Sequence, residues 1–269
     1  MHLSRAFDAG FETMSDRLLT AEREQAILRL LHKRRVMSVS ALSSALNVSE
    51  ATIRRDLQSM HERRLLQRIR GGAARNGLAR VEPVFSDKES QNTAEKERIA
   101  RRALDLIEDH DTIYLDGGST VLALARLLDV RDDLTIVTNS LMAAGVLMTS
   151  RHRLILSGGE FRALSRTLVG PLTSPVIRSL TVDKAFMGTI GFTIPDGMTT
   201  TDPGEAYTKE QIMERSHQVI LLVDSSKLGV DSFARSDDMA DLDAVVTDAA
   251  SADFQKRLGD HTVTLIKAE

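Results

Sequence analysis

The sequence predicts an α/β protein with two domains: an N-terminal winged helix-turn-helix, and a larger C-terminal domain with a mainly parallel, Rossmann-like sheet. Apolar residues recur at helical spacing between residues 22 and 63, whereas short β-branched runs alternate with helical segments after Asp111. The charge divides in the same way. Residues 1–80 carry 15 Lys and Arg against 8 Asp and Glu, a net of +7, while residues 81–269 carry 20 against 30, a net of −10. A small basic domain joined to an acidic one is typical of a nucleic-acid reader with a separate sensor.

Composition narrows the class of protein. The 269 residues, 42% of them hydrophobic and 27% charged, are enough for two globular domains. The absence of cysteine excludes disulfides and thiolate sites, and the seven histidines show no metal-ligand spacing, so we expect neither a metal nor a cofactor. No apolar run approaches the roughly 20 residues of a membrane span. Because a signal-peptide core is also lacking, we expect a cytoplasmic protein without a membrane partner.

The first domain is expected to begin with two helices. Residues 1–20 carry no clear element and are interpreted as an extension. A helix over Glu22–Lys33 and a second over Ser40–Leu46 would bury their leucines against each other. We assign the remaining chain to three parts: a winged helix-turn-helix over 21–76, a polar linker over 77–92, and an effector-binding domain over 93–269.

The next segment, from Asn47 to about Arg63, predicts the recognition helix of a helix-turn-helix. Ser49 occupies an N-cap position, and Ile53 and Leu57 belong to an apolar face at helical spacing. The opposite face carries small, polar and cationic side chains that suit a DNA major groove. An ordinary solvent-exposed helix is the alternative interpretation. The predicted DNA-contacting residues of this helix are Ser49, Ala51, Thr52, Arg54, Arg55 and Gln58.

Residues 65–75 predict two short strands around the Gly71-Gly72 turn, which we interpret as a wing. Arg68, Arg70 and Arg75 would lie near the phosphate backbone of a duplex and add affinity that is independent of base sequence. We include Arg68 and Arg70 among the predicted DNA-binding residues.

The second domain is predicted to contain a parallel sheet covered on both faces. After a helix over Thr93–Glu108, near-continuous apolar strands alternate with helices. The predicted strands are Thr112–Leu115, Leu134–Val137, Arg153–Leu156, Lys184–Met187, Val219–Val223, Ala244–Thr247 and Val263–Ile266. The intervening helices include Thr120–Leu128, Leu141–Met148, Glu205–Arg215 and Ala252–Leu258.

Polar turns follow five of these strands, three of them containing glycine, at the strand ends where ligands of parallel sheets bind. In Asp116–Thr120, two glycines and the free N–H groups of a helix start would suit a phosphate. Plain strand-to-helix turns are the alternative, but five in succession favour a shared crevice. Farther along, Glu205 and Lys209 share a helix face after a Gly/Thr-rich loop that we expect to close over the crevice. In this interpretation Lys209 neutralises the negative charge of the ligand and Glu205 binds a sugar hydroxyl. The alternative is that the two residues form an exposed ion pair on the helix.

The motifs together resemble the DeoR family of bacterial transcriptional regulators. The resemblance rests on Val48-Ser49-x-x-Thr52-Ile53-Arg54-Arg55-Asp56-Leu57, on Arg68-x-x-Gly71-Gly72-Ala73, on Glu82-Pro83-x-Phe85-x-x-Lys88 and on Glu95-Lys96-x-x-Ile99-Ala100. Arg35 and Arg64 depart from it, because this family often has glycine there. The resemblance implies a sensor fold like that of ribose-phosphate isomerases and a phosphorylated sugar or polyol as ligand. It assigns effector binding to Asp116, Gly117, Gly118, Ser119, Thr120, Thr138, Asn139, Ser140, Gly158, Gly159, Gly188, Glu205, Lys209, Asp224 and Lys227, with Arg166 as a weaker candidate.

Two functions follow as hypotheses. The first is a DNA-binding regulator, a repressor of a carbohydrate or polyol catabolic operon, that binds operator DNA as a homo-oligomer and responds to a phosphorylated sugar, sugar acid or polyol. The alternative is a sugar-phosphate isomerase-like enzyme with a nucleic-acid-binding appendage, in which Glu205, Lys209 and Asp116 would act as acid, base and charge stabiliser. Against the enzyme, Asp183-Lys184-Ala185-Phe186 stands where we associate the isomerases with paired acids. Loop side chains such as Tyr207 and Phe192 would set sugar specificity.

Overall fold

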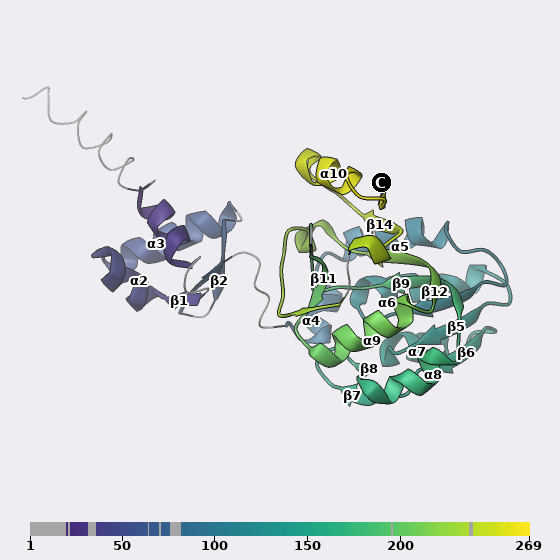
Figure 1. Cartoon of the computed structure of the whole chain (residues 1–269). Helices are drawn as coiled ribbons and strands as arrows, with labels where there is room; N and C mark the ends of the chain where they lie inside the picture. Colours follow the sequence, from purple (N-terminus) through teal and green to yellow (C-terminus); the bar gives the residue numbers. More distant parts are fainter. Residues whose placement is uncertain are drawn as a thin grey trace, which may run out of the picture. The chain divides into compact units, whose positions relative to one another are not determined.

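The computed structural model of the chain describes residues 20, 22–31, 36–63, 65–69, 71–75, 82–194, 196–236 and 239–269 (Figure 1). The chain forms two compact units, Met1–Leu78 and Ala79–Glu269. Within the described ranges, no helix is long and apolar enough to cross a membrane.

The first unit is a winged helix-turn-helix, as predicted. Residues 22–31 are helical, and the remaining elements are β1 (Val36–Ser38), α2 (Val39–Leu46), α3 (Glu50–Glu62), β2 (Leu66–Ile69) and β3 (Gly72–Arg75). The sequence analysis missed β1, which pairs antiparallel with β3 and gives the sheet order β1-β3-β2. Gly72 permits this pairing, because a Cβ there would lie 2.2 Å from the Met37 carbonyl oxygen.

Local chemistry positions α3 within this unit. Asn47 adopts a left-handed conformation (φ 52°) that ends α2, and the Ser49 hydroxyl caps α3 by accepting from Thr52 N at 3.2 Å. Ile53, Leu57 and Met60 of α3 are fully buried, together with Ile27, Leu31, Leu42 and Leu66. Burial of this apolar stripe turns the opposite face of α3 outward.

The second unit is built on a seven-stranded sheet in which every neighbouring pair is parallel. All seven predicted strands are present, with ends shifted by at most a few residues. The strand order is β15 (Thr264–Lys267), β14 (Ala244–Thr247), β12 (Ser216–Leu222), β9 (Val182–Met187), β4 (Thr112–Leu115), β5 (Thr135–Thr138) and β6 (Arg153–Leu156).

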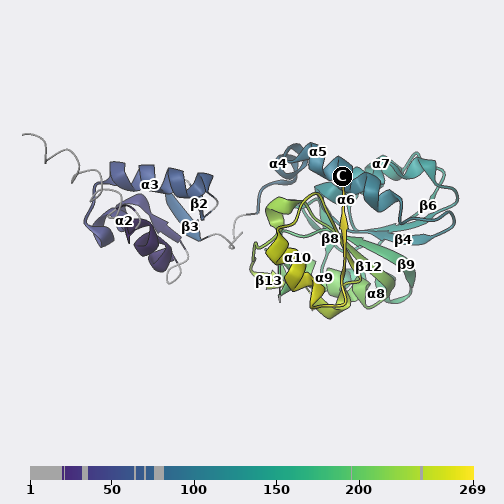
Figure 2. The ribbon, with the colours of Figure 1, turned by 90° about the horizontal axis from the view of Figure 1, so that it is seen from above.

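Helices cover both faces of this sheet, as Figure 2 shows edge-on. One face packs on α5 (Thr93–Leu104), α6 (Ser119–Ala125) and α7 (Leu141–Leu147), and the other on α8 (Ser174–Arg178), α9 (Pro203–Met213) and α10 (Ala252–Gly259). From β4 the chain runs outward through β5 and β6, then crosses back to β9 on the other side of β4. The strand order therefore reverses between β4 and β9, the place where doubly wound sheets form a crevice.

Smaller strands surround the sheet, and the sequence analysis missed them. They are the hairpin β7 (Glu160–Arg162) and β8 (Thr167–Val169), and the antiparallel sheet of β10 (Gly191–Thr193), β11 (Gly197–Thr200) and β13 (Ala234–Arg235). The prediction of a Gly/Thr-rich loop before Glu205 was therefore wrong in its first half, because Gly197–Thr200 form strand β11. The residues of β11 are buried, and the Thr199 hydroxyl donates to the Gly191 carbonyl at 3.1 Å.

The segment interpreted as the C-terminal part of a polar linker is structured. It contains α4 (Phe85–Ser90), whose Phe85 side chain is buried and whose backbone N donates to the Leu164 carbonyl at 3.1 Å. The preceding Glu82 is also buried and accepts from Thr201 at 2.7 Å. Residues 82–92 are thus part of the second unit and not a solvated linker, because Phe85 and the ionised Glu82 are buried there.

Candidate functional site

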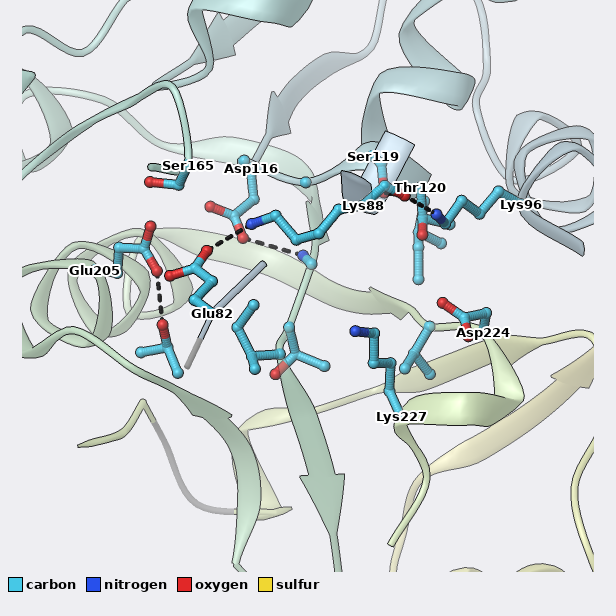
Figure 3. A pocket seen from close by; sticks show the side chains of 18 of the residues that line it. Glu82, Lys88, Lys96, Asp116, Ser119, Thr120, Ser165, Glu205, Asp224 and Lys227 are labelled. Carbon is cyan, nitrogen blue, oxygen red and sulfur yellow. Dashed lines mark hydrogen bonds and ion pairs between the residues drawn. The ribbon is translucent and has the colours of Figure 1, made fainter. Parts of the chain in front are cut away.

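A polar cavity lies at the carboxyl ends of β4, β5, β9 and β12, centred on the point where the strand order reverses (Figure 3). Turns after four strands contribute to it, so the shared crevice expected from the sequence exists. The predicted residues that line it are Asp116, Gly117, Gly118, Ser119, Thr120, Asn139, Gly188, Glu205, Lys209, Asp224 and Lys227.

The β4 and β9 turns are locked together at the centre of the cavity. Asp116 Oδ2 accepts from Gly188 N at 3.0 Å and forms an ion pair with Lys209 Nζ, which also donates to the Gly188 carbonyl at 2.8 Å. The turns approach so closely that a Cβ on Gly188 would lie 2.6 Å from the Gly117 carbonyl oxygen. Lys209 is therefore already paired within the protein, and its positive charge mainly balances Asp116.

One side of the cavity is suited to an anion. The backbone N–H groups of residues 117–120 donate to no acceptor in the described part of the chain, and Gly118 has a φ of 136° that favours glycine. Lys227 reaches the same cavity, and its ammonium group has no hydrogen-bond partner among the described residues (Figure 3). Burial lowers the pKa of Lys227; Asp224 raises it in part and Lys88 lowers it further.

The other side carries carboxylates held in a network. Glu205 accepts from the Thr200 hydroxyl at 2.6 Å and from Arg162 at 3.1 Å. Glu82 accepts from Lys88 at 2.5 Å and from Arg162 at 2.8 Å. Burial alone would raise the pKa of Glu82, but Lys88, Thr201 and Arg162 together hold it below its ordinary value. This carboxylate therefore remains ionised in the folded protein at neutral pH.

Four predicted residues do not reach the cavity. The Thr138 hydroxyl donates to the Leu115 carbonyl at 2.6 Å, and Ser140 caps α7 by accepting from Ala143 N at 3.2 Å. Gly158 and Gly159 follow β6, the edge strand, which is two strands from β4 and so about 10 Å away. The structure gives these four residues local structural roles instead.

The weaker candidates also lie elsewhere. Arg166 stacks over the Phe85 ring at 5.4 Å instead of lining the cavity. Phe192 is fully buried in the core, and the Tyr207 hydroxyl lies 2.7 Å from Ser174 Oγ, so the expectation that these two set sugar specificity was wrong.

Sequence reasoning missed the cavity wall formed by α4, α5 and the β7–β8 hairpin. Asn92 donates to Asp224 at 2.9 Å, and Lys96 donates to the carbonyls of Lys88 and Gln91. Burial lowers the pKa of Lys96, with a partial opposing effect from Asp224. The other missed residues include Glu82, Ser165, Thr167, Thr189 and Thr200. The sequence signal for this wall was the Glu82-Pro83-x-Phe85-x-x-Lys88 motif. Its spacing does not reveal that Glu82 pairs with Arg162, which lies far along the chain.

The outward face of α3 has the predicted composition. Ala51, Arg55 and Gln58 are exposed, as are Ser49 and Arg54, whereas Thr52 is half-buried. Arg54 pairs with Glu50 at 2.7 Å, and Arg68 of β2 donates to Gln58 at 2.9 Å, which joins the wing to the helix. Arg35, Arg64 and Arg70 lie outside the described residues, and the Arg75 side chain is not described.

Asp56 is the feature of α3 that the sequence analysis did not anticipate. It is buried on the inner face of the helix and accepts from Arg23 at 2.5 and 3.0 Å. This bidentate pair ties α3 to the first helix, so not every charged residue of the motif faces outward.

Comparison with known proteins identifies both units. Residues 23–77 match the DeoR-like helix-turn-helix domain, and residues 91–249 match the DeoR C terminal sensor domain. A Bacillus subtilis protein described as the uncharacterized HTH-type transcriptional regulator FruR is 34% identical over 250 residues, which cover 93% of this chain and 100% of the relative. The glycerol-3-phosphate regulon repressor of Escherichia coli is also 34% identical, over 91% of this chain and 97% of its own. The lactose phosphotransferase system repressor of Staphylococcus epidermidis is 36% identical, and the match covers 88% of this chain and 94% of the relative.

Among solved structures, ribose 5-phosphate isomerase A from Methanocaldococcus jannaschii is similar to this chain with a TM-score of 0.40. The two share 21% sequence identity, and the match covers 51% of this chain and 55% of the isomerase.

Proposed function

This chain belongs to the DeoR family of transcriptional regulators, and from that premise we propose that it represses a carbohydrate or polyol catabolic operon and responds to a phosphorylated sugar-type effector. The outward face of α3 and the wing bind operator DNA. The cavity of the sensor unit binds the effector, whose phosphate accepts hydrogen bonds from the Gly117–Thr120 backbone and faces Lys227.

One observation carries the effector proposal: among the described residues, neither the backbone N–H groups of residues 117–120 nor the Lys227 ammonium has a hydrogen-bond partner, and both border the same cavity. Donors without acceptors and a partly buried cation are costly unless an anion completes them. A phosphate ester supplies several acceptor oxygens and about two negative charges at neutral pH. The names of the relatives point in the same direction, since two of them are repressors of a glycerol-3-phosphate regulon and of a lactose phosphotransferase system.

We assign Glu205, Lys209 and Asp116 to binding and not to catalysis. Asp116 and Lys209 neutralise each other, and Glu205 is held by Arg162 and Thr200. A general acid or base must exchange a proton with its substrate, which such fixed pairing opposes. The alternative of an isomerase-like enzyme is therefore not favoured, in agreement with the regulator family.

We propose that the regulator acts as a homo-oligomer, because a single recognition helix contacts too few base pairs for specific binding and paired half-sites multiply affinity. Light scattering of the full chain tests this proposal, and a monomer bound to operator at stoichiometric concentration would contradict it.

The function is tested by fluorescence anisotropy with a duplex selected from a random library by the full-length protein. We expect one phosphorylated sugar or polyol to shift the binding midpoint, while its dephosphorylated form does not. Lys227→Met should abolish the shift, whereas Lys256→Met, an exposed lysine on α10, should retain it. If no phosphate ester changes DNA binding, or if Lys227→Met responds like the wild type, the proposal fails.

A further inference from the structure

We propose that the cavity selects a phosphate ester whose remaining groups are uncharged hydroxyls, and that it discriminates against phosphorylated sugar acids. This inference rests on the proposed function and narrows its ligand class. It follows from the side of the cavity opposite Lys227, where carboxylates and a carboxamide present acceptors to the ligand.

The Asp116 carboxylate has one oxygen available to a ligand. Its Oδ2 accepts from Gly188 N and Lys209 Nζ, whereas no described residue donates to Oδ1. Asp116 lines the cavity although only 2% of the residue is exposed. A ligand hydroxyl can donate to this oxygen, but a ligand carboxylate would place a second negative charge against it.

The Asn139 side chain gives a second, independent indication of a missing hydrogen-bonding partner. It lines the cavity from the end of β5, is 3% exposed, and its Oδ1 is buried without a partner. Among the described residues, Asn139 has only a backbone partner, with its main-chain carbonyl accepting from Leu168 N at 2.8 Å. Buried amides are rarely left unpaired. A hydroxyl suits this position because it can both donate and accept.

Formal charges divide across the cavity, as Figure 3 shows for its labelled residues. Near the anion side, Lys96 and Lys227 outnumber Asp224, which leaves a formal excess of +1. Among the residues that line the opposite side, two cations meet three carboxylates, a formal excess of −1: Lys88 and Lys209 against Glu82, Asp116 and Glu205.

A phosphate can therefore use the cationic side, but a ligand carboxylate at the other end would find every described cation there already paired. Burying an unpaired charge next to like charges is unfavourable. Turning the ligand around does not help, because its phosphate would then face the carboxylates. The division of charge thus fixes both the orientation of the ligand and the absence of a second anionic group.

Isothermal titration of the full-length protein with matched triplets tests this inference. Each triplet has one carbon skeleton with the phosphate on the same carbon, as an aldose, as the corresponding alditol and as the corresponding aldonic acid. In the triplet that binds most tightly, we expect the acid to bind at least about tenfold more weakly than its neutral counterparts. An acid that binds as tightly as either neutral ester overturns the inference alone. If no ester in any triplet binds, the proposed function fails as well.

A variant locates the origin of the discrimination. Glu205→Gln removes one negative charge with little change in shape, so the affinity ratio of acid to neutral ester should rise toward one. Asp183→Asn is the matched control, because this exposed carboxylate at the start of β9 accepts from Thr112 N, outside the cavity. Binding of the neutral ester shows that each variant is folded. An unchanged ratio in Glu205→Gln, or an equal rise in Asp183→Asn, contradicts the inference.

Discussion

The two polar surfaces of this regulator are built in opposite ways. The proposed DNA-binding surface lies mainly on α3, where Ala51, Arg55 and Gln58 are exposed neighbours on one helix. The proposed effector cavity is lined mostly by buried residues drawn from Glu82 to Lys227, many of them engaged in ion pairs or hydrogen bonds with distant parts of the chain. Single charges on the helix should therefore act independently, whereas charges in the cavity should act as a network.

Among these variants, Lys209→Met should cause the largest loss of stability. This change leaves Asp116 buried without its cation, and we expect the free energy of unfolding of the sensor unit to fall by about 3–5 kcal/mol. Denaturant unfolding followed by circular dichroism measures this value. The double variant Asp116→Asn/Lys209→Met should recover much of it, since no charge is then unpaired. A loss below about 0.5 kcal/mol in the single variant would mean that the cavity charges are not coupled.

Arg55→Ala should have the opposite effect: it should weaken operator binding without changing stability. An exposed arginine that contacts a base contributes about 1–3 kcal/mol to operator affinity, and its loss should leave the unfolding of the sensor unit unchanged. Anisotropy with the selected duplex and with a scrambled one measures the specific loss. Arg63→Ala, at the C-cap of the same helix, provides the control for a lost charge. Equal losses in both variants would argue against base contact by Arg55.

Lys227, whose ammonium has no hydrogen-bond partner among the described residues, should make the affinity for the proposed effector depend on pH. Phosphate binding favours protonated Lys227, whose pKa is lowered by burial, so affinity should fall as pH rises through that pKa. The fall can reach about tenfold per pH unit for one proton. Titrations from about pH 7 to about pH 10 avoid protonation of the phosphate. Lys227→Arg should flatten the profile, since arginine stays charged. A wild-type profile as flat as that of the variant would contradict this role.

The smallest effect on stability should come from Arg54→Ala. Its pair with Glu50 is exposed and spaced i, i+4, so we expect the unfolding free energy of the first unit to change by only about 0.3–0.5 kcal/mol. Operator affinity should fall more than stability does, because the guanidinium can leave Glu50 for the DNA. A stability loss above about 1 kcal/mol would show that α3 depends on its surface charges, unlike the independent surface described above.

The sequence was sufficient for the fold and for the part of the cavity that lies at the strand ends. The parallel strands are continuous apolar runs, so all seven could be predicted from β-branched residues and alternation with helices. The end of a strand is also visible in the sequence, which is why Asp116, Asn139, Gly188 and Asp224 were found. Similarly, the spacing of Ile53 and Leu57 revealed which face of α3 is outward.

The cavity residues and strands that were not predicted depend on contacts between distant segments, and such contacts produce no periodic pattern in the sequence. The segment from Glu82 to Asn92 is polar and therefore resembles a linker, but Glu82 pairs with Arg162 and Asn92 bonds to Asp224. The same polarity obscured β11, whose threonines direct their hydroxyls to backbone and carboxylate acceptors inside the protein. Buried polar residues of this kind become recognisable only when their partners are known.

The close approach of Gly117 and Gly188 has a practical consequence for anyone who wishes to rebuild this chain as a biosensor. A Cβ at either position would collide, at 2.2 Å with the Thr167 methyl group or at 2.6 Å with a main-chain oxygen, so libraries that randomise these turns would yield mostly misassembled proteins. Diversity is better introduced at Gln91, whose exposed side chain borders the cavity away from this contact.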